Sequence, residues 1–214
     1  MTRRFFPLAI ACLLFMQVNS VAQSNDVPKF EVAGEFSTLQ RQGFGEVRTE
    51  PGPGVRFTFN FNSMFAVEAA GYLFPHQCDI CRNGGNMSQV VAGVKVGKRF
   101  EKWGIFGKVR PGMVSFSRGE FTAVLTPGGP SPFDFETNRI TSFATDVGGV
   151  LEFYPSRRIV TRFDFGDTII HFRPRTVNGV SFNQITQEVT LFPFTRPART
   201  THSFQFIAGV GLRF

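Results

Sequence analysis

The sequence predicts an all-β fold in which eight antiparallel strands close into an up-and-down barrel. Apolar and polar residues alternate with a period of two along eight segments, the pattern of strands with one apolar and one polar face. The 214 residues include 28 Phe and 22 Gly, a composition that favours strands and turns over helices. The connections between the segments alternate between short and long, which is typical of barrels that cross a membrane.

The chain begins with the features of a secretory signal peptide. Two early arginines give a positive start, residues 5–16 form an apolar centre, and Ser20-Val21-Ala22 supplies small residues before a cleavage point. A spanning helix would need roughly 20 apolar residues. A buried N-terminal helix is the alternative, but this segment is apolar on all sides and lacks caps. We expect residues 1–22 to be a signal peptide and residues 23–214 to form the barrel domain.

The first four predicted strands alternate clearly. Apolar residues such as Phe36 face one way in the first strand and acids such as Glu35 the other, and the second sets three phenylalanines against Arg56 and its polar neighbours. Glu68 marks the polar side of the third strand, and Lys95 marks that of the fourth. Their segments are residues 30–37, 55–61, 65–74 and 88–98.

The last four predicted strands follow the same rule. The fifth places Lys108 opposite apolar residues, the sixth Asp146 and the seventh Arg162, and the eighth alternates apolar residues with small and polar ones up to Phe214. A closed barrel has no free edge for the missing N–H of proline, so Pro111 predicts a bulge or ladder break in the fifth strand. The segments are residues 103–113, 143–153, 159–165 and 203–214.

The connections predict which end of the barrel faces which compartment. Short connections are expected to be periplasmic turns and long ones outer loops. The short ones are residues 62–64, 99–102 and 155–158, and the long ones are residues 41–53, 75–87, 117–139 and 171–200. The predicted fold class is therefore an eight-stranded antiparallel up-and-down transmembrane β-barrel with short periplasmic turns and long outer loops.

Side-chain volume indicates which face lines the interior. The apolar faces are crowded with bulky residues that would overfill so narrow a barrel, whereas the polar faces hold small and charged residues. We therefore expect the apolar faces to point toward lipid and the charges to pair inside as a plug. The predicted lumen charges are Glu31, Glu35, Arg56, Glu68, Lys95, Lys108, Arg110, Asp146, Glu152, Arg162, Asp164 and Arg213.

Two cysteines follow the predicted cleavage point, and they lie close together in the sequence of one predicted loop. In an exported protein, Cys78 and Cys81 are expected to form a local disulfide. A redox pair is an alternative that would need a helix N-terminus, and a metal site with His76 and Asp79 is another that lacks a second ligand cluster. We assign no metal site.

The end of the chain resembles the assembly signal of bacterial outer-membrane barrels. Residues Phe204, Phe206, Val210, Leu212 and Phe214 alternate along the last strand and finish on a terminal Phe. A second resemblance is to the sixth-to-seventh-strand hairpin of the small OmpA-like barrels. It is carried by three runs of residues: Gly148-Gly149, Glu152-Phe153-Tyr154-Pro155-Ser156 and Arg162-Phe163-Asp164-Phe165-Gly166.

The resemblance implies a bacterial outer-membrane protein that contacts lipid, lipopolysaccharide and the barrel-assembly machinery. Peptidoglycan anchoring, known for longer members of the family, is not expected here because no domain follows the barrel. The chain also departs from the usual aromatic girdles, because it has one Trp and two Tyr beside its many Phe.

The leading functional prediction is a non-enzymatic outer-membrane barrel that acts in membrane structure and in surface interaction through its outer loops. A secreted lipocalin-like lipid-binding barrel and a lipid A-modifying barrel enzyme are the alternatives. His202 and Ser203 are adjacent on a strand, so they point to opposite faces and cannot form a catalytic pair. Removal of residues 1–22 lowers the formal net charge from +7 to +5, which does not imply nucleic acid. We expect a monomer without cofactors.

Overall fold

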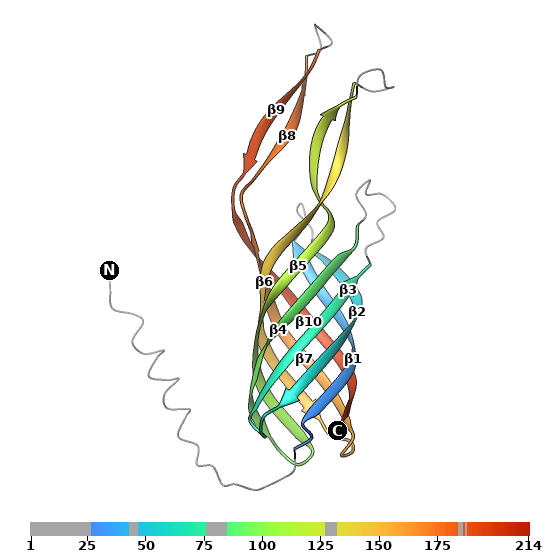
Figure 1. The fold of residues 1–214 in the computed structure, drawn as a ribbon, viewed down its shortest axis with the longest axis vertical. Helices are drawn as coiled ribbons and strands as arrows, with labels where there is room; N and C mark the ends of the chain where they lie inside the picture. The colour runs from blue at the N-terminus through green and yellow to red at the C-terminus, as the bar shows by residue number, and fades with distance from the viewer. Residues whose placement is uncertain (1–26, 43–46, 76–84, 127–131, 184–185, 187) are drawn as a thin grey trace, which may run out of the picture.

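The computed structural model is a closed antiparallel β-barrel from which two β-ribbons project (Figure 1). It describes residues 27–42, 47–75, 85–126, 132–183, 186 and 188–214. Among these residues, no helix is long and apolar enough to span a membrane. The ten strands are β1 (Phe30–Gln42), β2 (Val47–Asn60), β3 (Phe65–Phe74), β4 (Met87–Arg99), β5 (Trp103–Leu125), β6 (Phe133–Phe153), β7 (Ile159–Phe172), β8 (Arg175–Phe182), β9 (Val189–Arg196) and β10 (Arg199–Arg213).

Eight of the strands form the barrel, in the order β1-β10-β7-β6-β5-β4-β3-β2. Every neighbouring pair is antiparallel, and β1 closes the barrel against β10. At the closure, the Phe30 amide donates to the Phe214 carbonyl over 2.9 Å, and the Phe214 amide donates back to Phe30 over 3.0 Å. The predicted all-β, eight-stranded antiparallel barrel is confirmed.

Short turns gather at one end of the barrel, which we call the turn end, together with the C-terminus (Figure 1). Side-chain caps shape two of these turns. The Asn62 Oδ1 accepts from the amides of Met64 and Phe65, each at 2.8 Å. Ser156 Oγ accepts from the amides of Arg158 and Ile159 at 3.3 and 3.1 Å. Such bonds satisfy backbone N–H groups in the turns that have no partner in the β-ladders.

The opposite end, which we call the ribbon end, differs from the predicted loops. Much of residues 117–139 is strand, because Glu120–Leu125 of β5 pairs with Phe133–Asn138 of β6 beyond the barrel. Residues 171–200 contain the separate hairpin of β8 and β9. Most of residues 41–53 continues β1 and β2. These three connections are long, as predicted, but they are built largely of strands that the sequence analysis did not predict.

The ribbons were not predicted from the sequence, because apolar and polar residues are not separated between their two faces. Phe135 and Glu136 are consecutive, and both are exposed. Alternation arises only where one side of a strand is buried or meets a different solvent from the other. The two ribbons nevertheless touch, since the Asn178 amide of β8 donates to Thr122 Oγ1 of β5 over 3.1 Å.

Pro111 interrupts one ladder of the barrel wall. Pairing between β4 and β5 runs to Val91↔Gly112, skips two positions, and resumes at Val94↔Val109 in the same register. On its other side, Pro111 pairs with Thr145 of β6. The expected ladder break is thus present, while the register shift of β5 against β6 lies further along, between Phe116 and Glu120.

Candidate functional site: the barrel interior and its surfaces

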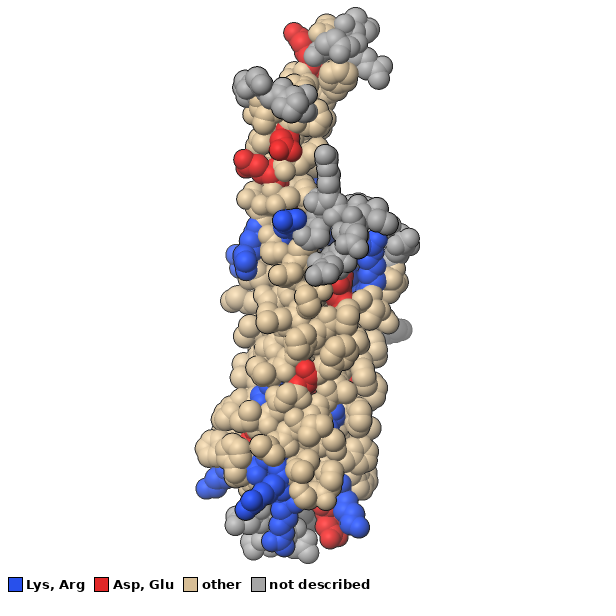
Figure 2. All heavy atoms as spheres, turned by 90° about the vertical axis from the view of Figure 1, so that its right-hand side faces the viewer, with Lys and Arg blue, Asp and Glu red and all other residues tan. Residues whose placement is uncertain are grey.

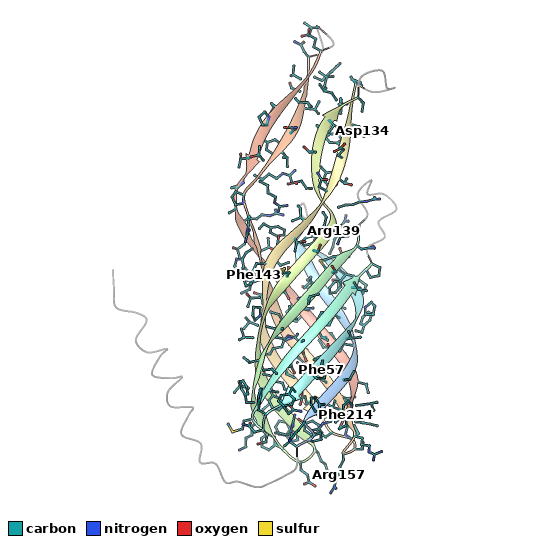
Figure 3. The ribbon with its side chains drawn as sticks, viewed as in Figure 1. Phe57, Asp134, Arg139, Phe143, Arg157 and Phe214 are labelled. Atoms are coloured by element: carbon teal, nitrogen blue, oxygen red, sulfur yellow. The ribbon has the colours of Figure 1, made fainter. Side chains whose placement is uncertain are left out.

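The outer surface of the barrel carries large apolar side chains on every strand of the wall. In Figure 3, Phe57 and Phe214 lie toward the turn end and Phe143 toward the ribbon end. Arg157 lies beyond this apolar band at the turn end, and Arg139 lies beyond it at the ribbon end. Figure 2 shows Lys and Arg gathered at two levels, with a band of mostly uncharged surface between them.

The interior holds the charges. All twelve predicted lumen residues are buried, with at most 6% of each exposed. Arg162 of β7 lies among three carboxylates: its Nε donates to Asp164 Oδ1 over 2.5 Å, its Nη2 donates to Glu68 Oε2 over 2.9 Å, and its Nη1 lies 3.5 Å from Glu152 Oε1. Lys95 pairs with the same Glu152 and lies 3.5 Å from Glu68 Oε1. Residues far apart in the chain thus share one ionic cluster.

Two further groups extend this cluster along the barrel axis. Arg110 donates to Asp146 Oδ2 from Nε over 2.9 Å and from Nη2 over 2.5 Å. Lys108 Nζ lies 2.9 Å from the same oxygen. On the other side of the barrel, Arg56 Nε donates to Glu35 Oε1 over 2.5 Å. Buried charges persist when they are paired and hydrogen-bonded in this way.

At the turn end the network includes two residues that were not predicted from the sequence, Arg99 and Tyr154. Arg99 Nη2 lies 3.5 Å from Glu31 Oε1, and Arg213 Nε lies 3.3 Å from the same oxygen. Arg99 Nε donates to the Tyr154 hydroxyl over 2.9 Å, and that hydroxyl donates to Glu152 over 2.8 Å. Burial raises the pKa of the Tyr154 hydroxyl above its usual value, and the neighbouring Glu152 carboxylate raises it further. The strand pattern could have placed Arg99 here, because it lies four residues after Lys95 and residues an even number apart on a strand point to the same face.

Toward the ribbon end, the charged network gives way to neutral polar groups. Gln205 Nε2 donates to Ser37 Oγ over 2.8 Å and to Gln89 Oε1 over 2.9 Å. Thr168 Oγ1 donates to Gln205 Oε1 over 2.6 Å. The Tyr72 hydroxyl connects the two zones by donating to Glu35 Oε2 over 2.7 Å. These amides and hydroxyls saturate one another across four strands.

An apolar cluster fills the interior above this polar zone. This cluster was not predicted from the sequence, because only small and charged residues were expected inside. Phe116 and Phe172 lie at its ribbon-end limit, with ring centroids 5.8 Å apart. The buried members are Leu39, Ala70, Tyr72, Phe74, Met87, Val91, Val114, Phe116, Ala144, Ile170 and Ile207.

The outward histidine of the last strand has a carboxylate partner. His202 Nδ1 lies 2.5 Å from Asp167 Oδ2, and the Ser203 amide donates to Asp167 Oδ1 over 2.9 Å. The His202 side chain is exposed, whereas Ser203 is buried. The pair therefore separates to the two faces of the strand, as the alternation requires, and His202 has no serine nucleophile beside it on this strand.

The remaining predicted sites divide into two groups. Cys78 and Cys81 lie outside the described residues, as do His76 and Asp79. In the part of the chain that is described, no group of three His, Cys, Asp or Glu side chains could hold a metal ion. The five residues of the predicted assembly signal, Phe204, Phe206, Val210, Leu212 and Phe214, lie at alternate positions from β10 to the C-terminus.

Comparisons with known proteins give structural matches only, since neither a family model nor a curated protein sequence matches the chain. The crystal structure of Neisserial surface protein A superposes with a TM-score of 0.51 at 13% identity, covering 87% of this chain and 97% of that one. Ail, the attachment invasion locus protein of Yersinia pestis, in complex with the heparin analogue sucrose octasulfate, gives 0.50 at 12% identity, covering 86% and 97%. The fold is that of the eight-stranded outer-membrane barrels.

Proposed function

We propose that this chain is a non-enzymatic, monomeric barrel of the bacterial outer membrane, which stiffens the membrane and presents two β-ribbons to the outside. One observation carries the proposal: bulky apolar residues cover the outside of the barrel while paired charges occupy the inside. Water would favour the opposite arrangement, and only a hydrocarbon surround makes this one stable.

The ends of the apolar band support the same orientation. Lys98, Lys102, Arg157 and Arg158 are exposed at the turn end, and Arg139 is exposed at the ribbon end. The lipid face of an outer-membrane barrel is roughly 25 Å tall. Cations at both limits of the apolar band suit phospholipid on one side and lipopolysaccharide on the other. The turn end is then periplasmic and the ribbons are extracellular.

Export and assembly follow from this placement. Residues 1–22 would be cleaved as a signal peptide, and Cys78 and Cys81 would oxidise to a disulfide in the periplasm. The final strand would be recognised by the barrel-assembly machinery through edge pairing, with Phe214 at its end. No cofactor is required at any step.

The interior network is proposed to act as a plug. Three layers follow one another along the barrel axis: the ionic cluster, the neutral polar groups around Gln205, and the apolar cluster. Water would have to pass all three to cross the barrel. In planar bilayers we expect no stable conductance from the purified barrel. Steady ohmic conductance of the unmodified barrel would contradict the plug but not the location.

The soluble lipocalin-like alternative needs the reverse orientation, because such a barrel encloses its ligand with apolar side chains. Here the wall residues Phe36, Phe57 and Phe165 are exposed, and the inward positions beside them hold Glu35, Arg56 and Asp164. The apolar cluster near Phe116 is packed with side chains and covers only one end of the interior.

Cell fractionation tests the location. We expect the mature chain in the outer-membrane pellet after carbonate washing, with a gel mobility that shifts on heating because the folded barrel resists detergent. A freely soluble periplasmic pool with no heat-dependent shift would overturn the proposal. A variant lacking residues 199–214 serves as the control, since without β10 the barrel cannot close.

A further inference from the structure

A groove lies at the turn end of the barrel, where β1 closes against β10. It has a volume of about 890 Å³, and three segments form its walls: residues 27–30 at the start of β1, Arg157 and Arg158 in the turn between β6 and β7, and residues 212–214 at the end of β10. In Figure 3, Phe214 and Arg157, which belong to two of these walls, both lie at this end. We call this feature the seam groove, because it spans the closing strand pair.

Hydrogen bonds to the backbone hold the walls of the seam groove in place. The Asn60 side chain donates to the Pro28 carbonyl, and the Asn60 amide donates to the Lys29 carbonyl, each over 2.8 Å. The Arg213 amide donates to the Arg158 carbonyl over 2.9 Å. The groove is therefore part of the folded wall, and its side chains extend from backbone positions that the fold fixes.

The seam groove has an apolar side and a cationic side. Phe30, Leu212 and Phe214 are exposed on the outside of the barrel wall. Arg157 and Arg158 are exposed in the turn, which lies beyond the last residues of the wall. An amphiphile whose acyl chains follow the wall would bring its headgroup to these cations.

Three cations of the groove have no acidic partner. Arg213 is paired, because its Nε lies 3.3 Å from Glu31 Oε1. Lys29, Arg157 and Arg158, by contrast, form no ion pair with any described residue. All three are exposed, so their charges are available to a ligand.

The acids that could approach the groove are too few to cancel this charge. None of the described residues that line it is Asp or Glu. The only acid among residues 1–26 is Asp26, which precedes Val27 in the sequence. A second negative charge is the terminal carboxylate of Phe214. When both are counted against the three unpaired cations, one positive charge still remains.

We propose that the seam groove binds an anionic phospholipid, with its phosphate against the three unpaired cations and its acyl chains along the exposed apolar residues beside them. Guanidinium groups bind phosphate through paired N–H donors, and cations at a lipid surface attract negative headgroups. Because the walls come from β1 and β10, one bound lipid contacts both strands of the closing pair. The inference rests on the proposed function, because the turn end then meets the periplasmic leaflet.

Native mass spectrometry tests the site by measuring which lipid the folded barrel retains. The chain is reconstituted in vesicles of equal parts phosphatidylglycerol and phosphatidylethanolamine and then released into mild detergent. We expect one phosphatidylglycerol to be retained in preference to phosphatidylethanolamine. In Arg157→Gln/Arg158→Gln this retention should fall at least roughly fivefold, because two of the three cations are lost. Lys29→Gln, which lies before β1 and outside the strands, should lower it as well.

The matched control is Lys98→Gln/Lys102→Gln, which removes two exposed cations from the β4–β5 hairpin, outside the groove. Its retention of phosphatidylglycerol should equal that of the unmodified chain. An equal loss in this control would show diffuse attraction to the whole turn end, and equal retention of both lipids by the unmodified chain would show no selection of charge. Either result would refute the groove as a binding site.

A separate measurement distinguishes failure of the site from failure of the proposed location. Heat-dependent gel mobility verifies that each variant is folded before its lipid is measured. A folded chain that is recovered in the outer-membrane pellet but retains no phosphatidylglycerol would refute the lipid site and leave the location standing. A chain recovered as a soluble periplasmic protein would refute the location, and the lipid site with it.

Discussion

At the scale of the residue, Arg162 determines how the interior charges are balanced. It contacts Asp164, Glu68 and Glu152, and all four side chains are buried. Replacing Arg162 by Met leaves these carboxylates short of a partner, which typically costs about 3–5 kcal/mol. We expect urea unfolding in lipid to show a loss of that order. Arg158→Met, an exposed turn residue, should change stability by no more than about 0.5 kcal/mol.

Tyr72 gives a second test of the interior, at the junction between its charged and neutral zones. Its hydroxyl donates to Glu35 Oε2, whose carboxylate also accepts from Arg56. Tyr72→Phe removes the donor without changing packing, and an incompletely satisfied buried acceptor costs about 1–3 kcal/mol. A double-mutant cycle with Glu35→Gln measures the coupling. Additive effects of the two substitutions would show that this hydrogen bond contributes nothing.

Most of the charged interior was predictable from parity alone, because each charge shares a strand face with other polar residues. The apolar cluster was not, although Tyr72 and Phe74 have the parity of Glu68. Apolar residues were predicted to face lipid as a class, but the two ends of one barrel can be filled differently. Phe116 and Phe172 also lay beyond the predicted strands, and Phe172 fell in a segment that was predicted to be a loop.

At the scale of the element, the β8–β9 ribbon is separable from the barrel. Its strands pair only with each other, and β7 pairs directly with β10. Replacing residues 176–195 by a short Gly-Ser turn removes no rung of the barrel wall. We therefore expect the same heat-dependent gel shift and the same urea midpoint as in the full chain. Loss of the shift would show that the ribbon is needed to fold the barrel.

The elements that the sequence predicted are those whose two faces meet different surroundings. β3 was found with its correct ends, Phe65 and Phe74, because both of its faces are sorted along its whole length. β5 was found only to Met113 and in fact continues to Leu125. Beyond the barrel its two faces meet water or the neighbouring ribbon, so no pattern is imposed on residues such as Thr122 and Val124.

At the scale of the whole molecule, the membrane placement predicts that equal substitutions differ in cost with their position. Phe165 on the barrel wall and Phe192 on the ribbon are exposed to nearly the same extent, 45% and 47%. If hydrocarbon surrounds the wall, Phe165→Arg should destabilise the barrel in bilayers by roughly 2–4 kcal/mol, the cost of arginine near the middle of the lipid face. Phe192→Arg is in water and should cost less than about 0.5 kcal/mol.

These two substitutions distinguish a membrane barrel from a soluble one more sharply than the exposed fractions of the side chains do. Both side chains are exposed to nearly the same extent, so only the surrounding solvent differs. The measurement is reversible urea unfolding in phosphatidylcholine vesicles, followed by the fluorescence of Trp103, which lies at the turn end away from both substitutions. Equal small costs at the two positions would mean that the apolar band is covered by protein or water and not by lipid. A large cost at Phe192 alone would place the ribbon, rather than the wall, against an apolar partner.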